Sequence, residues 1–328
     1  MTAAMGDAVV LRTECGVDTS PRRAQHRRKT MTRRSLLAGL AGFGGVPAAS
    51  FARGAPPALR IAVTDWAAAE SLLAIGVAPL AVPDIAVYRQ WLREIPLPPS
   101  VVDLGSRAEP NLELLASLAP DRILVSNWQR SLVALFRRIA PTETITIIGG
   151  RSDAYANARA ALVQVADLVN RPDAAPAYLG AFDRALASFT RALEGQYLPP
   201  VYVAVLHENG TQLFAYGRGS WVDDVIRHLG LSNALRQPTS AFGNALIGLA
   251  ELAGTPEALL LYLDQGERTR RAERSLATST VWRSLPMVRA GRVHRIPPFY
   301  ALGGVPSVWR CGRLITSALA GLPEASRE

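Results

Sequence analysis

The stretch that decides the fold runs from Asp84 to Leu115 and reads DIAVYRQWLREIPLPPSVVDLGSRAEPNLELL. We predict that irregular, Pro-rich backbone carries Tyr88, Trp91 and Arg107, and that a helix begins near Pro110. Proline suits the first helical position, where its missing N–H is no loss, and the leucines that follow recur at helical spacing. Arg107 then lies in a strand-to-helix connection, where open α/β sheets place their ligand contacts.

A guanidinium flanked by two aromatic rings can bind a planar, negatively polarised and partly apolar ligand, through charge-assisted hydrogen bonds and stacking. The alternative is a solvated surface arginine beside two core aromatics, and composition alone favours that alternative. The residues of this stretch leave both interpretations open.

Outward from this stretch, short apolar runs alternate with helical patterns, which favours parallel sheets covered by helices. In the first half we expect the following elements: strands at Leu59–Thr64, Pro79–Val82, Val101–Leu104 and Arg122–Ser126, and helices at Ala67–Ile75 and Asn111–Leu118. In the second half we expect strands at Val201–Leu206, Thr211–Ala215 and Leu259–Leu263, and a helix at Trp221–Leu229. Leu112–Val125 and Leu249–Leu261 share the order helix, Pro-acidic turn, apolar strand, which indicates two similar lobes in tandem.

The longest helical pattern lies between the halves. Apolar residues recur at helical spacing over residues 153–169, which predicts a helix there, and Asn170-Arg171-Pro172 ends it. Ala174–Leu193 predicts a second amphipathic helix. These helices either bridge two lobes or form a helical hairpin inside one domain, and the pattern alone does not choose.

The N-terminus has the features of an export signal. Residues 1–30 are polar and Arg-rich, Thr32-Arg33-Arg34-Ser35-Leu36-Leu37 resembles a twin-arginine motif, and the uncharged run Ser35–Ala52 ends in small residues. We therefore expect an N-terminal extension at 1–30 and a twin-arginine signal peptide at 31–52, cleaved near Ala52. A membrane anchor is the alternative, and either Met1 or Met31 can be the start. No cysteine lies directly after the apolar run, so we expect a periplasmic protein that is not lipid-anchored.

Charge and residue usage exclude several functions. Residues 1–52 supply five of the nine net positive charges, so the high pI does not indicate nucleic-acid binding. The only lysine is Lys29, within the predicted signal, which excludes a nucleotide-loop or Schiff-base lysine after cleavage. Cys311 is then the one cysteine left and should pack as a small apolar residue in the C-terminal helix. The histidines lack metal-ligand spacing, and no catalytic motif is present. We predict no resident metal or cofactor and no enzymatic activity.

Three segments of the chain, including 84–115, resemble one protein family. Asp65-Trp66 and Glu70–Val77 (ESLLAIGV) match its first segment, Val281–Arg292 (VWRSLPMVRAGR) matches its last, and 84–115 matches through YRxW and DxGxRxEPNLELL. The chain resembles the periplasmic iron(III)-hydroxamate siderophore-binding proteins of the ferrichrome type, which serve ABC importers. The last segment is shared with haem and cobalamin binders, so a binding protein for another iron carrier, haem or cobalamin is the alternative function. An exported enzyme is an alternative of a different class.

The resemblance implies a class III periplasmic binding protein. This is an α/β fold in which two Rossmann-like lobes with parallel sheets are joined by a single long bridging helix. The expected parts are an N-terminal lobe at 58–150, the bridging helix at 151–171 and a C-terminal lobe at 172–323. The ligand would be a pre-chelated ferric hydroxamate, and we expect the protein to be a monomer.

The resemblance also implies site residues. Arg107 matches the ligand-binding arginine, and Trp66 and Trp91 match pocket tryptophans. Gln129 stands where the family has a hydroxamate-binding tyrosine, with Trp128 beside it. Phe242 and Tyr300 replace pocket tryptophans, and Tyr88 is a further aromatic candidate. Importer docking in this family uses one acidic residue on each lobe. Glu113 matches the first, and Glu251 lies one residue beyond the position of the second.

Overall fold

The first sheet begins with a short apolar strand that is buried on both faces, β1 (Ile61–Val63). The chain then enters helix α1 (Trp66–Ala74), where the Asp65 side chain caps the helix by accepting a hydrogen bond from the Ala67 N–H. The computed structural model describes residues 59–149, 153–196 and 198–320. Both predicted parts of the presequence, 1–30 and 31–52, lie outside the described residues.

The first sheet is parallel throughout, as predicted, in the order β3-β2-β1-β4-β5. Its other strands are β2 (Ala81–Val82), β3 (Val102–Asp103), β4 (Arg122–Ser126) and β5 (Thr142–Ile145). Only β4 agrees with its predicted bounds at both ends. Strands β1, β2 and β3 are only two or three residues long and cover part of the apolar runs on which the predictions rested.

The second sheet is mixed, which corrects the prediction of purely parallel strands. Its order is β10-β9-β6-β7-β8, and β7 runs antiparallel to both of its neighbours. The strands are β6 (Val201–Leu206), β7 (Gln212–Tyr216), β8 (Asn244–Gly248), β9 (Leu259–Leu263) and β10 (Val293–Ile296). Only five residues connect β6 to β7, which suffices for a hairpin but not for the crossover that a parallel pair needs.

Read from opposite edges, the two sheets share one plan. In the first sheet the central strand β1 lies between β2 and β4. In the second sheet the central strand β6 lies between β7 and β9, so that β9 occupies the position of β4. Helix α3 (Leu112–Ser117) precedes β4, and the 3-10 helix η2 (Leu249–Gly254) precedes β9. This equivalence confirms the predicted tandem of two similar lobes.

Helices surround both sheets. The remaining ones are α2 (Ile85–Trp91), the 3-10 helix η1 (Asn127–Leu132), α4 (Val133–Phe136), α5 (Ala154–Leu168), α6 (Ala174–Leu193), α7 (Trp221–His228), α8 (Glu267–Thr278), α9 (Thr280–Ser284), α10 (Pro286–Arg289) and α11 (Val305–Ala320). Helix α2 corrects one expectation, because Tyr88 and Trp91 lie on a helix and not on irregular backbone.

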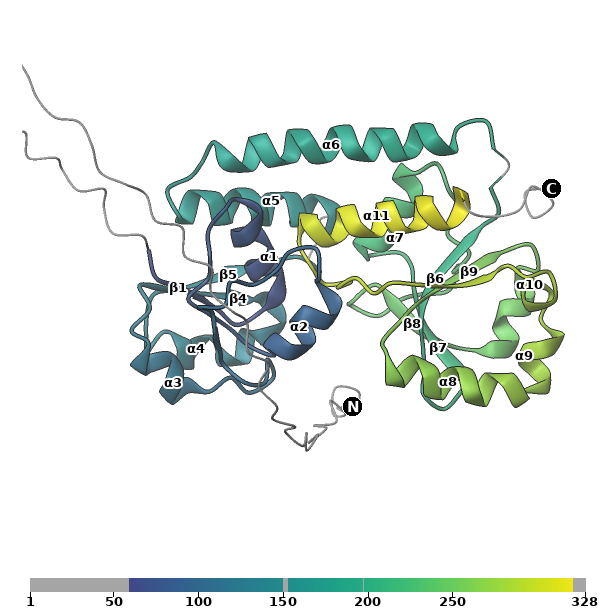
Figure 1. Ribbon diagram of the computed structural model, residues 1–328, viewed down its shortest axis with the longest axis horizontal. Coiled ribbons are helices and arrows are strands. Elements are labelled where there is room, and N and C mark those ends of the chain that lie inside the picture. The colour runs from purple at the N-terminus through teal and green to yellow at the C-terminus, as the bar shows by residue number, and fades with distance from the viewer. Residues whose placement is uncertain (1–58, 150–152, 197, 321–328) are drawn as a thin grey trace, which may run out of the picture. The chain divides into compact units, whose positions relative to one another are not determined.

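One continuous apolar core connects the two sheets. It contains Trp66 of α1, Leu162 of α5, Trp221 of α7 and Val308 of α11, together with strand residues of both sheets. Helices α5, α6 and α11 run side by side in Figure 1. Helix α5 contacts α1 at the first sheet and α7 at the second, and α11 contacts the same two helices. That a single bridging helix joins the lobes stays a prediction. The domain boundaries at 58–150, 151–171 and 172–323 stay predictions.

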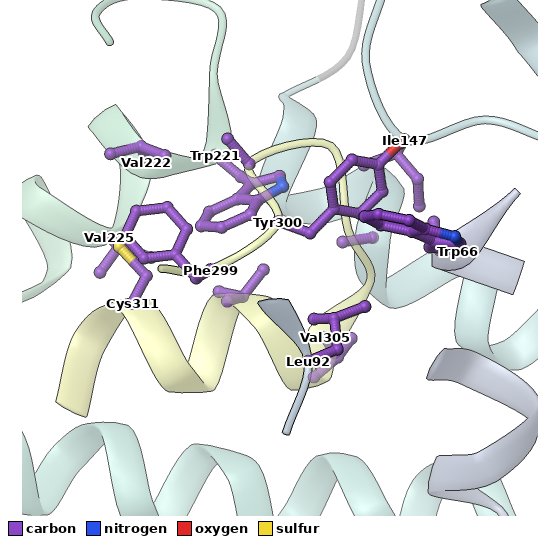
Figure 2. Close-up of a cluster of buried hydrophobic side chains, with 14 of the residues drawn as sticks. Trp66, Leu92, Ile147, Trp221, Val222, Val225, Phe299, Tyr300, Val305 and Cys311 are labelled. Atoms are coloured by element: carbon purple, nitrogen blue, oxygen red, sulfur yellow. The ribbon is translucent and has the colours of Figure 1, made fainter. Parts of the chain in front are cut away.

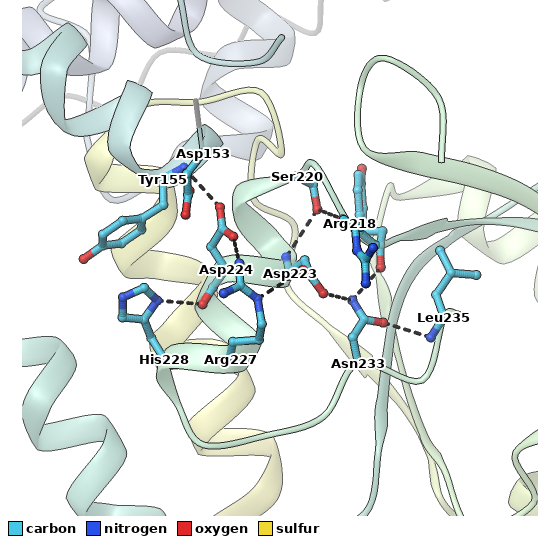
Figure 3. Close-up of polar contacts among 12 residues, drawn as sticks. Asp153, Tyr155, Arg218, Ser220, Asp223, Asp224, Arg227, His228, Asn233 and Leu235 are labelled. Atoms are coloured by element: carbon cyan, nitrogen blue, oxygen red, sulfur yellow. Dashed lines mark hydrogen bonds and ion pairs between the residues drawn. The ribbon is translucent and has the colours of Figure 1, made fainter. Parts of the chain in front are cut away.

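Polar contacts fix the start of α5 to α7 (Figure 3). The Tyr155 N–H donates to Asp153 Oδ1 at 2.8 Å and to Asp224 Oδ2 at 3.2 Å, while the His228 ring stacks on the Tyr155 ring. Burial raises the pKa of Asp224 to about 7, and the hydrogen bond that its protonated form donates to Asp153 acts in the same direction. Burial therefore favours the neutral form of the Asp224 carboxyl group at the contact between α5 and α7.

Cys311 lies buried in α11, as predicted, and burial raises the pKa of its thiol well above the usual value. Among the described helices, none combines the length and apolar character that a membrane span requires. Within the same residues, no group of three or more His, Cys, Asp or Glu side chains is arranged to hold a metal ion.

Candidate functional site

Arg107 lies in the connection between β3 and α3, as predicted. An isolated antiparallel β-bridge between Gly105 and Pro110 closes the base of this loop, and Arg107 lies in the turn between them. The guanidinium carbon lies 3.5 Å from the centroid of the Trp66 ring and 5.3 Å from that of Tyr300. The side chain is partly exposed, at 24%. This geometry supports the interpretation of a stacked guanidinium over that of a solvated surface arginine.

Asp84 fixes the direction of Arg107, and sequence reasoning did not single it out. Its Oδ2 accepts hydrogen bonds from the Arg107 backbone N–H at 3.1 Å and from Nε at 3.0 Å. Asp84 itself has a left-handed backbone with φ of 53°, and its N–H donates to the Gly105 carbonyl at 2.6 Å. Its place before α2 resembles a helix cap, but its side chain makes no capping hydrogen bond.

Trp66 forms the floor beneath Arg107. It is 1% exposed, and its Nε1 donates to the Pro83 carbonyl at 2.9 Å. The rings of Tyr88 and Tyr300 meet it edge-on, with centroids 5.8 and 5.1 Å away. Figure 2 shows Trp66 beside Tyr300 within the buried cluster. In this structure Trp66 therefore presents its face to the guanidinium and not to solvent.

Asp65 is a second residue that sequence reasoning left out of the site. It is 1% exposed, and Oδ2 accepts from Trp128 Nε1 at 3.0 Å and from the Tyr300 hydroxyl at 3.1 Å. Trp128 belongs to η1 in the first half of the chain, and Tyr300 precedes α11 in the second. One carboxylate oxygen thus joins aromatic residues from both halves beside Arg107.

Gln129 lies inside the protein and supports the loop of Arg107. It is 1% exposed, and its Nε2 donates to the carbonyls of Arg107 at 2.9 Å and Thr64 at 3.0 Å. Its Oε1 accepts from the Thr64 hydroxyl at 2.7 Å. Because both ends of the amide are bound internally, Gln129 positions Arg107 in this structure and does not face a ligand.

Tyr88 and Trp91 lie on α2. Tyr88 is fully buried, its hydroxyl donates to the Ile95 carbonyl at 3.0 Å, and burial strongly raises the pKa of its phenol. Trp91 is half-buried at the end of the helix. Tyr88 therefore contributes to the wall behind Trp66, while Trp91 keeps an accessible edge.

Trp128 and Phe242 meet across a small cavity of about 10 Å³. Its lining comes from both halves of the chain: Ser126, Asn127, Trp128, Ile147, Ile148, Phe242 and Leu302. Ligand pockets usually enclose about 300–1,000 Å³. The cavity is therefore too small for such a ligand unless these side chains move apart.

The two acidic docking candidates are both exposed and lie at equivalent places, in α3 before β4 and in η2 before β9. Glu113 lies in the first turn of α3. The Glu251 carboxylate caps η2 by accepting hydrogen bonds from Gln237 Nε2 and from the Gly248 N–H. Both hydrogen bonds lower the pKa of Glu251, and the one from Gln237 has the larger effect.

A larger cavity of about 280 Å³ lies elsewhere, between the loop after α2, α6 and α11. None of the predicted site residues lines it. Its walls are mainly apolar, and Phe182 and Trp309 are among them.

Comparisons with known proteins identify the family of this chain. The family model described as "Periplasmic binding protein" matches residues 61–300. The chain is 30% identical to the iron(3+)-hydroxamate-binding protein FhuD of Escherichia coli (strain K12) over 262 residues, which cover 80% of this chain and 87% of that protein. It is 26% identical to the Fe(3+) dicitrate-binding periplasmic protein FecB of the same organism over 62% of this chain and 65% of that one.

The fold also matches a solved structure of a ligand complex. The crystal structure of the Fe3+-Desferal-bound siderophore-binding protein FhuD from Vibrio cholerae superposes with a TM-score of 0.75 and 31% identity, covering 80% of this chain and 98% of that one. The predicted two-lobed fold and the prediction of a binding protein in place of an enzyme are therefore confirmed. The chain belongs to the periplasmic binding protein family.

Proposed function

We propose that the protein binds a ferric hydroxamate siderophore outside the cytoplasmic membrane and delivers it to an ABC importer. The observation that carries the proposal is the Arg107 guanidinium, stacked 3.5 Å above Trp66 and held at Nε by Asp84. Asp84 occupies Nε and the backbone N–H of Arg107. Among the residues that the structure describes, the two Nη groups have no hydrogen-bond partner, so they are the donors left for a ligand. They form a planar fork suited to partly negative oxygens.

Hydroxamate oxygens that chelate iron fit this fork. They share negative charge with the metal, and the iron stays within the oxygen shell of the siderophore. The partly exposed rings of Trp128 and Phe242 suit the apolar linkers of such a chelate. Iron is then cargo, and we propose that the protein needs no cofactor of its own. The relatives named as hydroxamate- and Desferal-binding proteins support this ligand class.

The alternative of a haem ligand has less support at this site. An axial tyrosine would have to offer an oxygen to iron. The Tyr88 hydroxyl donates to the Ile95 carbonyl, and the Tyr300 hydroxyl donates to Asp65. Burial raises the pKa of both phenols, so that forming the phenolate is unfavourable.

We also propose that the protein reaches the periplasm by the twin-arginine route, on the basis of Arg33-Arg34 and the apolar run Ser35–Ala52. Importer docking through Glu113 and Glu251 is supported by their exposure at equivalent places in the two lobes. We propose Glu113 as the main contact, because the Glu251 carboxylate is already bound to η2.

Intrinsic fluorescence titration tests the ligand class. Trp66, Trp91 and Trp128 lie in or around the site, so ferric hydroxamates should quench the emission with saturation. Haemin and cobalamin serve as competitors. Saturable quenching by haemin or cobalamin but not by any ferric hydroxamate would contradict the proposal.

A further inference from the structure

The cavity of about 280 Å³ between the loop after α2 and the helices α6 and α11 lies apart from Arg107. Helices α6 and α11 run side by side (Figure 1). We call this space the α6–α11 cavity, and its main walls are Leu92, Ile95, Tyr178, Phe182, Trp309 and Arg310. A cavity of about 150 Å³ holds one benzene ring. The α6–α11 cavity therefore has room for a molecule of about two fused rings.

Aromatic side chains from two helices give the cavity its character. Tyr178 and Phe182 are one turn apart on α6, and Trp309 belongs to α11. Phe182 is buried, while Tyr178 and Trp309 are half-buried. Leu92 and Ile95 add aliphatic surface from the loop after α2. Because aromatic rings pair favourably with one another, these walls favour a flat aromatic ligand over an aliphatic chain.

Arg310 brings a buried cation to the wall of the cavity. It is 6% exposed, and its Nε donates to the Pro298 carbonyl at 2.7 Å. Its Nη1 lies 2.5 Å from Glu94 Oε1, in an ion pair without the geometry of a hydrogen bond. A buried N–H that donates no hydrogen bond is unfavourable. An acceptor on a ligand in the cavity would remove that cost.

Glu94 does not balance the positive charge at this place. Its Oε1 pairs with Arg310 and also accepts a hydrogen bond from Arg313 Nη2. Among the residues that the structure describes, Glu94 is the one carboxylate paired with either arginine, and Arg313 Nε is buried without a hydrogen-bond partner. The Arg313 guanidinium also lies 5.3 Å from the Trp309 ring centroid. Two guanidinium groups and one carboxylate leave one net positive charge beside an aromatic cavity.

We propose that the α6–α11 cavity is a second ligand site, which takes an aromatic carboxylate of about two rings. The rings would lie against Phe182 and Trp309, and the carboxylate would accept hydrogen bonds from Arg310 and Arg313. A carboxylate matches the planar guanidinium fork and balances the net charge. None of the residues assigned to the siderophore lines this cavity, so the inference does not depend on the proposed function.

The test compares naphthoate with naphthamide, which has the same rings and no charge. Ligand-observed NMR titration gives the dissociation constants of both, and their ratio cancels a general loss of binding in a variant. For the wild-type protein we expect a naphthoate Kd below about 1 mM. Naphthamide should bind about fivefold to tenfold more weakly, because its hydrogen bonds to the arginines lack the assistance of charge.

Glu94→Gln should raise naphthoate affinity by about threefold to tenfold, because it removes the carboxylate that competes for both guanidinium groups. A variant that merely damaged the cavity would not show this gain. Arg313→Gln should bring the affinities for naphthoate and naphthamide close together. Ala181→Trp, at an exposed position that lines the cavity, should weaken both ligands by filling the entrance. Arg289→Gln, an exposed arginine on α10, is the control and should keep both dissociation constants.

Absence of saturable naphthoate binding to the wild-type protein would overturn this inference. Equal affinity of the wild type for naphthoate and naphthamide would overturn it as well, since the arginines would then play no part. Naphthoate binding that stays at the wild-type value in both Glu94→Gln and Arg313→Gln would place the ligand elsewhere on the protein and overturn it equally. Each of these results would leave the proposed siderophore function in place.

Discussion

Gln129 and Arg107 are joined by a hydrogen bond in which the amide Nε2 of Gln129 donates to the Arg107 carbonyl across 2.9 Å. The glutamine also binds Thr64 through both ends of its amide. The residue that stands at the place of a ligand-binding tyrosine thus connects the loop of Arg107 to the end of β1. Arg107 is held from two sides, at its carbonyl by Gln129 and at its Nε by Asp84.

The first prediction follows from this connection. Gln129→Glu should weaken ligand binding and lower the free energy of unfolding by about 1–3 kcal/mol, because an acceptor would replace the donor that faces two carbonyl groups. Chemical denaturation and siderophore titration of the same preparation measure the two effects. Gln90→Glu, at an exposed position of α2, is the matched control. Wild-type affinity together with wild-type stability in Gln129→Glu would contradict a positioning role for Gln129.

A second prediction concerns Glu70, which joins α1 to α11. Its carboxyl oxygens accept hydrogen bonds from the Ser307 hydroxyl and backbone N–H. Burial is the main cause that raises its pKa from 4.5 to about 8. The folded state therefore binds more protons than the unfolded state between these two values. The free energy of unfolding should fall as pH rises through this window, by at most about 1.4 kcal/mol per pH unit, and the loss is complete above about pH 8.

Glu70→Gln imitates the protonated carboxyl group and should remove this part of the pH dependence. The measurement is the difference in unfolding free energy between wild type and Glu70→Gln at several pH values between about 5 and 9. The variant should gain stability relative to wild type as pH rises. A constant difference across this range would show that Glu70 does not titrate there.

A third prediction concerns docking. Glu113→Gln should weaken association with the reconstituted importer several-fold and reduce its salt dependence, because it removes one exposed charge from a rim contact. Glu251→Gln should have a smaller effect on association. Siderophore affinity should stay at the wild-type value in both variants. Wild-type association and salt dependence in both would exclude these two residues as docking contacts.

A fourth prediction concerns export. Changing Arg33-Arg34 to Lys-Lys should leave the precursor in the cytoplasm, because the paired arginines are the signal that the twin-arginine pathway reads. Cell fractionation followed by immunoblotting measures the distribution. Normal periplasmic appearance of the variant would assign export to another route and would not affect the binding proposal.

Sequence reasoning located the elements that are long or fully buried. The bounds of β4, β6, β9 and α6 are as predicted, because continuous apolar runs or a clear helical period define them. It missed α2, a helix of only seven residues without a side-chain cap. Strand β7 was predicted to within one residue at each end, but its antiparallel direction was missed. An apolar strand looks alike in either direction, and only its short connection indicates a hairpin.

The candidate site shows the same limit. Arg107, Trp66 and Tyr300 were expected together, and they meet. Asp84 and Asp65 were not selected, because Asp84 reaches Arg107 across 23 residues and Asp65 reaches Tyr300 across 235. No local pattern reveals such pairs, and each aspartate before a helix resembles an ordinary cap. The one signal available in the sequence was that the predicted arginine needs an acidic partner.

The most direct test of the central claim is calorimetric titration with two chelates, ferrioxamine B and ferrichrome. Each is titrated into the wild-type protein, Arg107→Ala and Arg107→Lys. We predict saturable binding by the wild type and a loss of about 1.5–3 kcal/mol in Arg107→Ala, or roughly ten- to a hundredfold in affinity. Arg107→Lys should also bind weakly, because an ammonium group cannot reproduce the planar fork. Folded variants that bind both chelates as tightly as the wild type would contradict the assignment of Arg107 as the ligand-binding residue.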